Sequence, residues 1–235
     1  MDDLQKQVLN NAVLPEDPEE LLGTAQQLQN VLMMYSCAIR EVKTKLEVLN
    51  DELSIKNQRN PIEFITTRVK NPMSIAEKLH RRGFEISLDS VMDNLNDVAG
   101  VRVICSFVDD IYAVAAMLTK QDDVALLQVK DYIKNPKPNG YRSLHLIIEI
   151  PVFFSDKKEN LRVEVQIRTI AMDFWASLEH DLRYKKDLID VPQDIQDELR
   201  DCAETIADTD RRMMNLRDRI ELLKVSQLQE NDYKN

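Results

Sequence analysis

The chain has 235 residues, of which 43% are hydrophobic and 31% are charged, which is enough for one well-filled core with flanking helices. Its formal net charge of −10 argues against strong nucleic-acid binding, because such binding needs clustered Lys and Arg. No apolar stretch reaches the roughly 20 residues of a membrane span, and the N-terminus lacks the pattern of a signal peptide. The spacing of Cys37, Cys105 and Cys202 fits neither a zinc site nor a disulfide framework. We expect a cytoplasmic protein with reduced thiols.

Both ends of the chain carry apolar residues at steps of three and four, which is typical of amphipathic helices. Residues 19–57 predict either one long helix or two helices joined by a turn, and residues 193–225 predict a similar helix. We divide the chain into three regions: N-terminal helical (1–57), core (58–186) and C-terminal helical (187–235).

The middle of the chain alternates between strand and helix patterns. Short runs rich in β-branched residues predict strands at residues 101–107, 124–129, 143–151 and 161–167. A helix pattern over residues 110–120 lies between the first two of these. Helices therefore precede, interrupt and follow a mixed sheet, which is an α/β or α+β core with helical flanks.

A first group of polar residues follows one extended segment and opens a helix. Arg68 and Lys70 are two residues apart, so they share one side of an extended chain. Asn71 and Pro72 predict a helix start, since Asn is a good N-cap and Pro suits the first helical position. The helix then presents one polar stripe: Ser74, Lys78 and Arg81. Free amides, a hydroxyl and several cations suit a polyphosphate, and the alternative is a solvated basic helix face.

A second group lies in residues 132–145, where two prolines and a glycine predict a rigid, turn-rich loop. The loop delivers Tyr141 to the start of an apolar strand, and His145 follows on the same face. An aromatic ring beside cations such as Lys137 can stack on a nucleotide base. The alternative is an ordinary surface loop with a packed tyrosine.

A third group alternates strictly along residues 162–168. Its polar side chains share one face of a strand: Arg162, Glu164, Gln166 and Arg168. Polar groups on an interior strand need partners, whereas an edge strand would turn them to solvent. Glu164 can bind Mg²⁺ or accept a proton, and Asp97, just before the first strand, offers a second carboxylate. The chain has no P-loop and no GxGxxG motif.

Four motifs occur in order over about residues 60–185 and together resemble the RelA/SpoT-type alarmone synthetases. They are Arg68-x-Lys70-x-x-x-Ser74-x-x-x-Lys78, Asp97-x-Ala99-Gly100-x-Arg102, Lys137-Pro138-Asn139-Gly140-Tyr141-Arg142-Ser143-Leu144-His145 and Glu164-Val165-Gln166-Ile167-Arg168-Thr169. The short length and the lack of an HD hydrolase domain resemble the small alarmone synthetases. The sequence of residues 170–180 is more similar to the RelP branch than to the RelQ branch.

The resemblance implies a nucleotidyltransferase-like mixed sheet flanked by helices. It also implies a reaction in which ATP gives its β,γ-pyrophosphate to the 3′-hydroxyl of GDP or GTP, leaving AMP and (p)ppGpp. A homotetramer built from the flanking helices, with residues 187–235 as an oligomerisation region, is implied as well. The sequence does not rank GDP against GTP as the acceptor.

The resemblance also implies a role for each matching residue. The ATP-binding residues would be Arg68, Lys70, Ser74, Lys78, Arg81 and Arg102. The residues around the acceptor nucleotide would be Lys137, Tyr141, His145, Gln166 and Glu179. Asp97 and Glu164 would bind Mg²⁺, and Glu164 would also activate the 3′-hydroxyl.

One feature departs from the RelQ pattern, in which an allosteric alarmone binds between subunits. Phe64 and Lys43 match that pattern, but Asp173 takes the place of an Asn and Glu47 the place of a Lys. Added carboxylates repel a polyphosphate, so we expect no strong activation by pppGpp. Three other functions stay open: a nucleotidyltransferase that moves a nucleotidyl group, a module that binds alarmone or RNA without turnover, and a helical scaffold.

Overall fold

The computed structural model describes residues 18–57, 59–184 and 192–232. The elements occur in the order α2 (Pro18–Asn57), β1 (Ile62–Val69), α3 (Pro72–Arg81), α4 (Leu88–Asn94), β2 (Ala99–Cys105), α5 (Val108–Thr119), β3 (Ala125–Asp131), β4 (Leu144–Phe153), β5 (Lys158–Thr169), α6 (Ile170–Tyr184) and α7 (Gln193–Asp232). Part of the predicted N-terminal region and the predicted boundary at residue 186 lie outside the described residues.

The five strands form one mixed sheet in the order β1-β2-β5-β4-β3. β2 and β5 are parallel and every other neighbouring pair is antiparallel, which confirms the predicted mixed sheet. The alternation along β5 holds as expected, since Val163, Val165 and Ile167 are fully buried. The structure extends one prediction. The sequence indicated only an extended segment at Arg68 and Lys70, whereas a full strand, β1, forms there.

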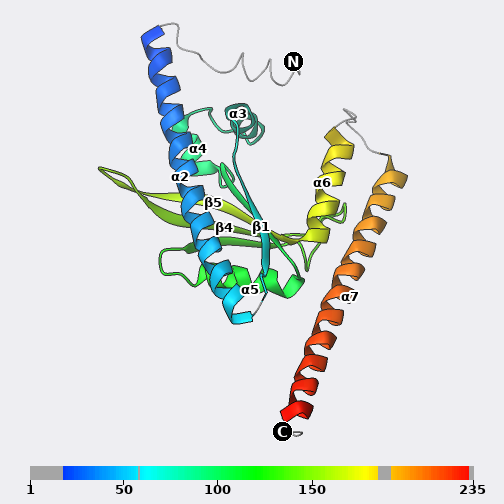
Figure 1. Ribbon diagram of the computed structural model, residues 1–235. Helices are drawn as coiled ribbons and strands as arrows, with labels where there is room; N and C mark the ends of the chain where they lie inside the picture. The colour runs from blue at the N-terminus through cyan, green and yellow to red at the C-terminus, as the bar shows by residue number, and fades with distance from the viewer. Residues whose placement is uncertain (1–17, 58, 185–191, 233–235) are drawn as a thin grey trace.

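Two helices cover one face of the sheet (Figure 1). α2 is a single helix of 40 residues, which decides between the two predicted arrangements of residues 19–57. Its residues Val42 and Leu46 are fully buried in the core that also contains Val163 and Val165. α5 packs against the same strands and against α2. Because side chains alternate along a strand, Glu164 and Gln166 face away from these helices.

α3 begins as the sequence predicts. The Asn71 side chain accepts a hydrogen bond of 2.7 Å from the amide of Ser74, and Pro72 opens the helix. Ile75 and Leu79 are buried and attach α3 to the core. The helix therefore holds a fixed position after β1.

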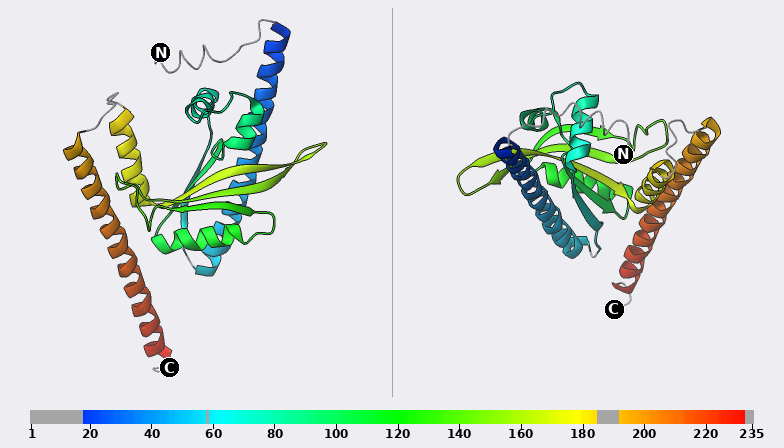
Figure 2. Two further views of the ribbon diagram at one scale, coloured as in Figure 1. Left: turned by 180° about the vertical axis from the view of Figure 1, so that it is seen from behind. Right: turned by 90° about the horizontal axis from the view of Figure 1, so that it is seen from above.

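α6 and α7 lie side by side at the other end of the sheet from α2, as both views in Figure 2 and the view in Figure 1 agree. α7 confirms the predicted C-terminal helix and continues to Asp232. Both helices keep apolar residues exposed: Ile170, Phe174, Leu178 and Leu182 on α6, and Met213, Leu216, Ile220 and Leu223 on α7. Within the described segments, no helix has the length and apolar character to cross a membrane.

Candidate functional site

A cavity of about 410 Å³ opens on the face of the sheet opposite α2 and α5. Its size falls in the range typical of small-molecule sites, and its walls are mostly polar. The lining residues come from β1, β2, β5 and the segments beside them: Thr66, Thr67, Arg68, Lys70, Asp97, Gly100, Val101, Arg102, Glu164 and Gln166. We call this cavity the central pocket.

Asp97 lies at one end of the central pocket between two lysines. Its Oδ2 accepts hydrogen bonds from Lys70 Nζ at 2.9 Å and from Lys78 Nζ at 2.6 Å. Burial raises the pKa of Asp97, but the hydrogen bonds and charges of Lys78 and Lys70 together bring the pKa below its ordinary value. Its other oxygen, Oδ1, is buried and has no hydrogen-bond partner among the described residues. Such an atom is available to a cation or a donor that enters the pocket.

The two lysines leave this end of the pocket rich in positive charge, because they share a single carboxylate oxygen. Burial lowers the pKa of Lys78, the hydrogen bond and charge of Asp97 raise it, and the charges of Lys70 and Arg82 lower it again, so the pKa lies below its ordinary value. The charged ammonium is therefore less favourable here than in water. An anion such as a phosphate group would stabilise that charged form.

Glu164 lines the pocket from β5 and is held by two hydrogen bonds. Its Oε1 is 3.1 Å from His145 Nδ1, and its Oε2 accepts from Gln166 Nε2 at 2.9 Å. Burial raises the pKa of Glu164, but the hydrogen bond and charge of His145 and the hydrogen bond of Gln166 bring the pKa below its ordinary value. Glu164 is therefore ionised at neutral pH.

An aromatic group adjoins the pocket through His145, whose Nε2 is 2.9 Å from the Tyr141 hydroxyl. Tyr132 meets the Tyr141 ring edge-on with 6.1 Å between centroids. The Lys137 ammonium lies 4.8 Å from the Tyr132 centroid and 4.7 Å from that of Tyr141. Burial raises the pKa of Tyr141. The Lys137 ammonium lies over both rings, so aromatic faces and a positive charge occur together on this surface. Such a surface also suits a flat, polar ligand.

Arg168 connects the aromatic group to the pocket through hydrogen bonds to Tyr141 and Gln166. It is 3% exposed, and it donates to the Tyr141 hydroxyl at 3.1 Å and to Gln166 Oε1 at 2.8 Å. Its Nη1 also lies 3.3 Å from Asp173 Oδ1, which is in turn 3.5 Å from Arg102. The charge of Asp173 is thus balanced by two guanidinium groups at the edge of the pocket, a placement that the sequence did not indicate.

The structure gathers most, but not all, of the residues singled out from the sequence. Arg68, Lys70, Asp97, Arg102, Glu164 and Gln166 line the pocket directly. Lys78, Tyr141 and His145 join it through hydrogen bonds, and Glu179 accepts from Asn139 of the loop at 3.1 Å. Ser74 and Arg81 stand on α3 and are not among the lining residues.

Other residues at the site were given no role from the sequence. Thr66 and Thr67 line the pocket from β1, a strand whose pattern gave no clear signal. Gly100 lies opposite Arg68, and an added Cβ there would meet the Arg68 carbonyl oxygen at 3.5 Å. Tyr132 opens the loop of residues 132–145, and this position in the sequence could have indicated its part in the site.

The described residues contain no cluster of three or more His, Cys, Asp or Glu side chains suited to a metal ion. A cation in the central pocket would therefore rely on the two carboxylates of Asp97 and Glu164. Mg²⁺ commonly binds through one or two carboxylates and completes its shell with water and phosphate oxygens. The unpartnered Oδ1 of Asp97 fits this arrangement.

Comparison with known proteins agrees with the geometry. The family model described as a region found in RelA and SpoT proteins matches residues 67–188. The chain is 43% identical to GTP pyrophosphokinase YwaC of Bacillus subtilis over 203 residues, which are 86% of this chain and 96% of that protein.

Two solved structures from Bacillus subtilis extend this likeness to the fold. Small alarmone synthetase 2 is 45% identical with a TM-score of 0.74, covering 82% of this chain and 98% of that one. Small alarmone synthetase 1 bound to its product pppGpp is 36% identical with a TM-score of 0.76, covering 83% and 98%. On the matched region and on these identities, the chain belongs to the RelA/SpoT family.

Proposed function

We propose that this protein is a (p)ppGpp synthetase of the small alarmone synthetase type, which acts in the stringent response. It transfers the β,γ-pyrophosphate of ATP to the 3′-hydroxyl of GDP or GTP and releases AMP. The observation that carries this proposal is the junction at Glu164. This carboxylate lines the cation-rich central pocket and also contacts His145, whose other ring nitrogen contacts Tyr141. The named activity of the similar Bacillus proteins supports it.

The donor nucleotide would occupy the β1 and β2 side of the pocket. Arg68 and Arg102 lie on these neighbouring strands, and guanidinium groups stack well on a flat base such as adenine. Lys70 and Lys78 would hold the phosphates, which would relieve the excess positive charge around Asp97. Ser74 and Arg81 would bind the outer part of the phosphate chain, beyond the pocket lining.

The carboxylates of Asp97 and Glu164 would hold Mg²⁺, and Asp97 Oδ1 is the atom best placed to do so. When bound there, the ion would supply charge stabilisation for the transferring group. Glu164 is ionised at neutral pH, so it can accept the proton of the acceptor hydroxyl. Transfers of this kind depend mainly on alignment and charge, which these residues provide.

The acceptor nucleotide would bind on the aromatic side. Tyr141 would stack on guanine, and Lys137, which lies over the same ring, would move toward the acceptor phosphates. His145 and Gln166 would keep Glu164 oriented toward the 3′-hydroxyl. Glu179 is tied to the loop through Asn139 and would contact the guanine edge.

The proposal is tested by incubating the protein with ATP labelled at the γ-phosphate, GDP and Mg²⁺. Pyrophosphate transfer predicts one AMP for each labelled ppGpp formed, with both added phosphates on the 3′-oxygen. Release of pyrophosphate would instead indicate nucleotidyl transfer. Binding of both nucleotides with no product would indicate a sensor module and overturn the proposal.

We also propose the finer assignments that the family resemblance implies. In this proposal the chain is nearest to the RelP branch, has a catalytic core at residues 58–186 and acts as a cytoplasmic homotetramer. The exposed apolar stripes on α6 and α7 support an assembly, because a single chain leaves these apolar side chains in contact with water. Multi-angle light scattering should give four times the chain mass, and a monomer at micromolar concentration would contradict the assembly.

A further inference from the structure

α7 touches the loop that carries Tyr141 at an unusually close distance. Gly140 has a φ of +89°, and a Cβ built on it would lie 2.6 Å from Ala203 Cβ on α7. It would also meet the backbone of Arg200 at 3.4 Å. Only glycine adopts this backbone conformation without strain, and only glycine admits the helix so closely. We call residues 137–143 the acceptor loop.

Arg142 fastens the acceptor loop to the same part of α7. Its Nη1 donates to the Gly140 carbonyl at 3.1 Å and to the Ala203 carbonyl at 3.4 Å. Its Nη2 donates to Glu204 Oε1 at 2.8 Å. The Arg142 side chain is only 11% exposed, so this guanidinium connects the loop to α7 within a largely buried contact. We call this contact, between residues 140–142 and residues 200–204 of α7, the junction. Arg142 has no place in the nucleotide contacts proposed above.

Tyr141 itself packs into the junction. The buried residues Trp175 and Ala203 form a small apolar cluster with Tyr141, and Leu199 and Ile206 of α7 pack against it. Trp175 Nε1 donates to the Leu199 carbonyl at 3.0 Å, which fixes α6 to α7 at this level. The ring that would stack on guanine is therefore supported on one flank by the C-terminal helix.

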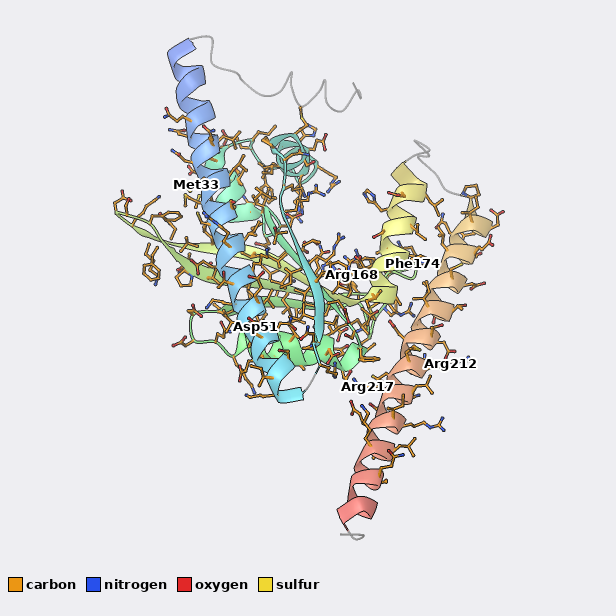
Figure 3. All side chains as sticks on the ribbon, in the orientation of Figure 1. Met33, Asp51, Arg168, Phe174, Arg212 and Arg217 are labelled. Carbon is orange, nitrogen blue, oxygen red and sulfur yellow. The ribbon has the colours of Figure 1, made fainter. Side chains whose placement is uncertain are left out.

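α7 also has anchors that are independent of the acceptor loop. The Thr169 hydroxyl donates to Asp210 at 2.5 Å. Arg217 makes a two-pronged contact with Asp109 of α5, at 2.9 and 2.8 Å, and lies over the Phe107 ring (Figure 3). Because of these anchors, a change at Ala203 or Glu204 disturbs the junction without releasing the whole helix.

We propose that α7 positions the acceptor loop, so that its contacts at Gly140 and Arg142 hold Tyr141 ready for the guanine nucleotide. The inference rests on the proposed function, since it needs the acceptor to bind at Tyr141. Coupling of this kind is reciprocal: if α7 favours acceptor binding, acceptor binding stabilises the docking of α7. Ala203, Glu204 and Arg142 are positioning residues that do not touch the reacting groups.

Steady-state kinetics with ATP, GDP and Mg²⁺ test the inference through two variants. Ala203→Leu places a larger side chain against Gly140 and should raise the KM for GDP about tenfold, while the KM for ATP stays within about twofold. Glu204→Gln removes one partly exposed charge and should raise the KM for GDP about threefold. Glu198→Gln, an exposed carboxylate on α7 outside the junction, is the matched control and should leave both constants unchanged.

Fluorescence supplies a second readout that does not depend on turnover. Trp175 is the single tryptophan of the chain and lies inside the junction. Titration of the wild type with GDP should shift its emission, and Glu204→Gln should need about threefold more GDP for the same shift. A non-hydrolysable ATP analogue alone should cause little change.

Two outcomes would overturn the inference while leaving the proposed function intact. One is an unchanged KM for GDP in both variants, with an unresponsive tryptophan. The other is an equal rise in the KM values of both substrates, or a fall in kcat alone, which would indicate general structural damage. A wild type that binds nucleotides but forms no (p)ppGpp would instead refute the proposed function.

Discussion

Two ammonium groups and one carboxylate set the charge at the donor end of the pocket. Burial raises the pKa of Asp97, but the hydrogen bonds and charges of Lys78 and Lys70 together keep it below its ordinary value. Its folded pKa is lower than its unfolded value of about 3.9, so the ionised form stabilises the fold above that pH. This stabilisation is lost as the pH falls through the folded value.

Replacing Asp97 with Asn should therefore have a pH-dependent effect on stability. At pH 7 the variant should lose about 2 kcal/mol of unfolding free energy, because two half-buried cations lose their charged partner. The gap from the wild type should narrow below about pH 4. Urea unfolding at several pH values measures this difference in unfolding free energy, and Asp156→Asn, at an exposed aspartate, is the control. A gap that does not change with pH would show that the carboxylate charge is not the cause.

Tyr141 has two separable contributions, a ring and a hydroxyl. Tyr141→Ala removes the ring and should raise the KM for GDP by roughly 10- to 100-fold, because stacking on a base contributes about 1–3 kcal/mol. Tyr141→Phe keeps the ring and loses the contacts with His145 and Arg168, so the KM should rise by less than about tenfold. Initial rates at varied GDP decide this, and equal effects of the two variants would exclude stacking.

At the residue scale, spacing alone indicated which side chains share a face. Arg68 and Lys70, or Glu164 and Gln166, meet in the pocket because alternation along a strand is a local property. The ion pairs of Asp173 with Arg102 and Arg168 join three separate elements, and no local pattern encodes such a meeting. The helical stripe of α3 brought Lys78 to Asp97, but it did not indicate that Arg81 stays exposed outside the pocket.

At the scale of single elements, α3 shows how a cap supports a site. The Asn71 side chain accepts a hydrogen bond from the Ser74 amide, one turn before Lys78. Asn71→Ala should lower the free energy of unfolding by about 1 kcal/mol and raise the KM for ATP, because the first turn loosens. Asn71→Asp keeps an acceptor and should restore both values. Thermal unfolding and ATP kinetics give the stability and the KM for ATP of both variants. Equal losses in the two variants would show that the Asn71 cap does not support the site.

Most elements were predictable because their apolar residues repeat at the period of a helix or strand. β1 was missed because its exposed positions outnumber its buried ones, so that no alternation is visible. It becomes a strand by pairing with β2, which is a tertiary cause. The continuity of α2 has the same origin, since the sheet and α5 support the helix over its buried residues.

At the scale of the whole molecule, regulation between subunits is expected to be weak. Lys43, one of the residues that match the RelQ pattern, already lies 3.5 Å from Glu47 on α2. Asp173 offers a carboxylate engaged by Arg102 and Arg168 where that pattern has an amide. Initial rates with and without added pppGpp should differ by less than about twofold. Stimulation of several-fold would contradict this expectation.

The mixed sheet, its helical flanks and the family follow from the sequence, because the four motifs fall on strands and loops that one core brings together. The seating of α7 on the acceptor loop does not follow, since it depends on one glycine meeting one alanine across about 60 residues of chain. The central claim is that a single pocket, which Glu164 lines, performs pyrophosphate transfer.

The most direct test compares AMP and ppGpp production by the wild type, Glu164→Ala and Glu159→Ala with ATP, GDP and Mg²⁺. Glu159 lies on the same strand outside the pocket and serves as the control. The account predicts product from the wild type and the control, and a loss of at least about 100-fold in folded Glu164→Ala. Equal product from Glu164→Ala and the wild type, or none from the wild type, would contradict it.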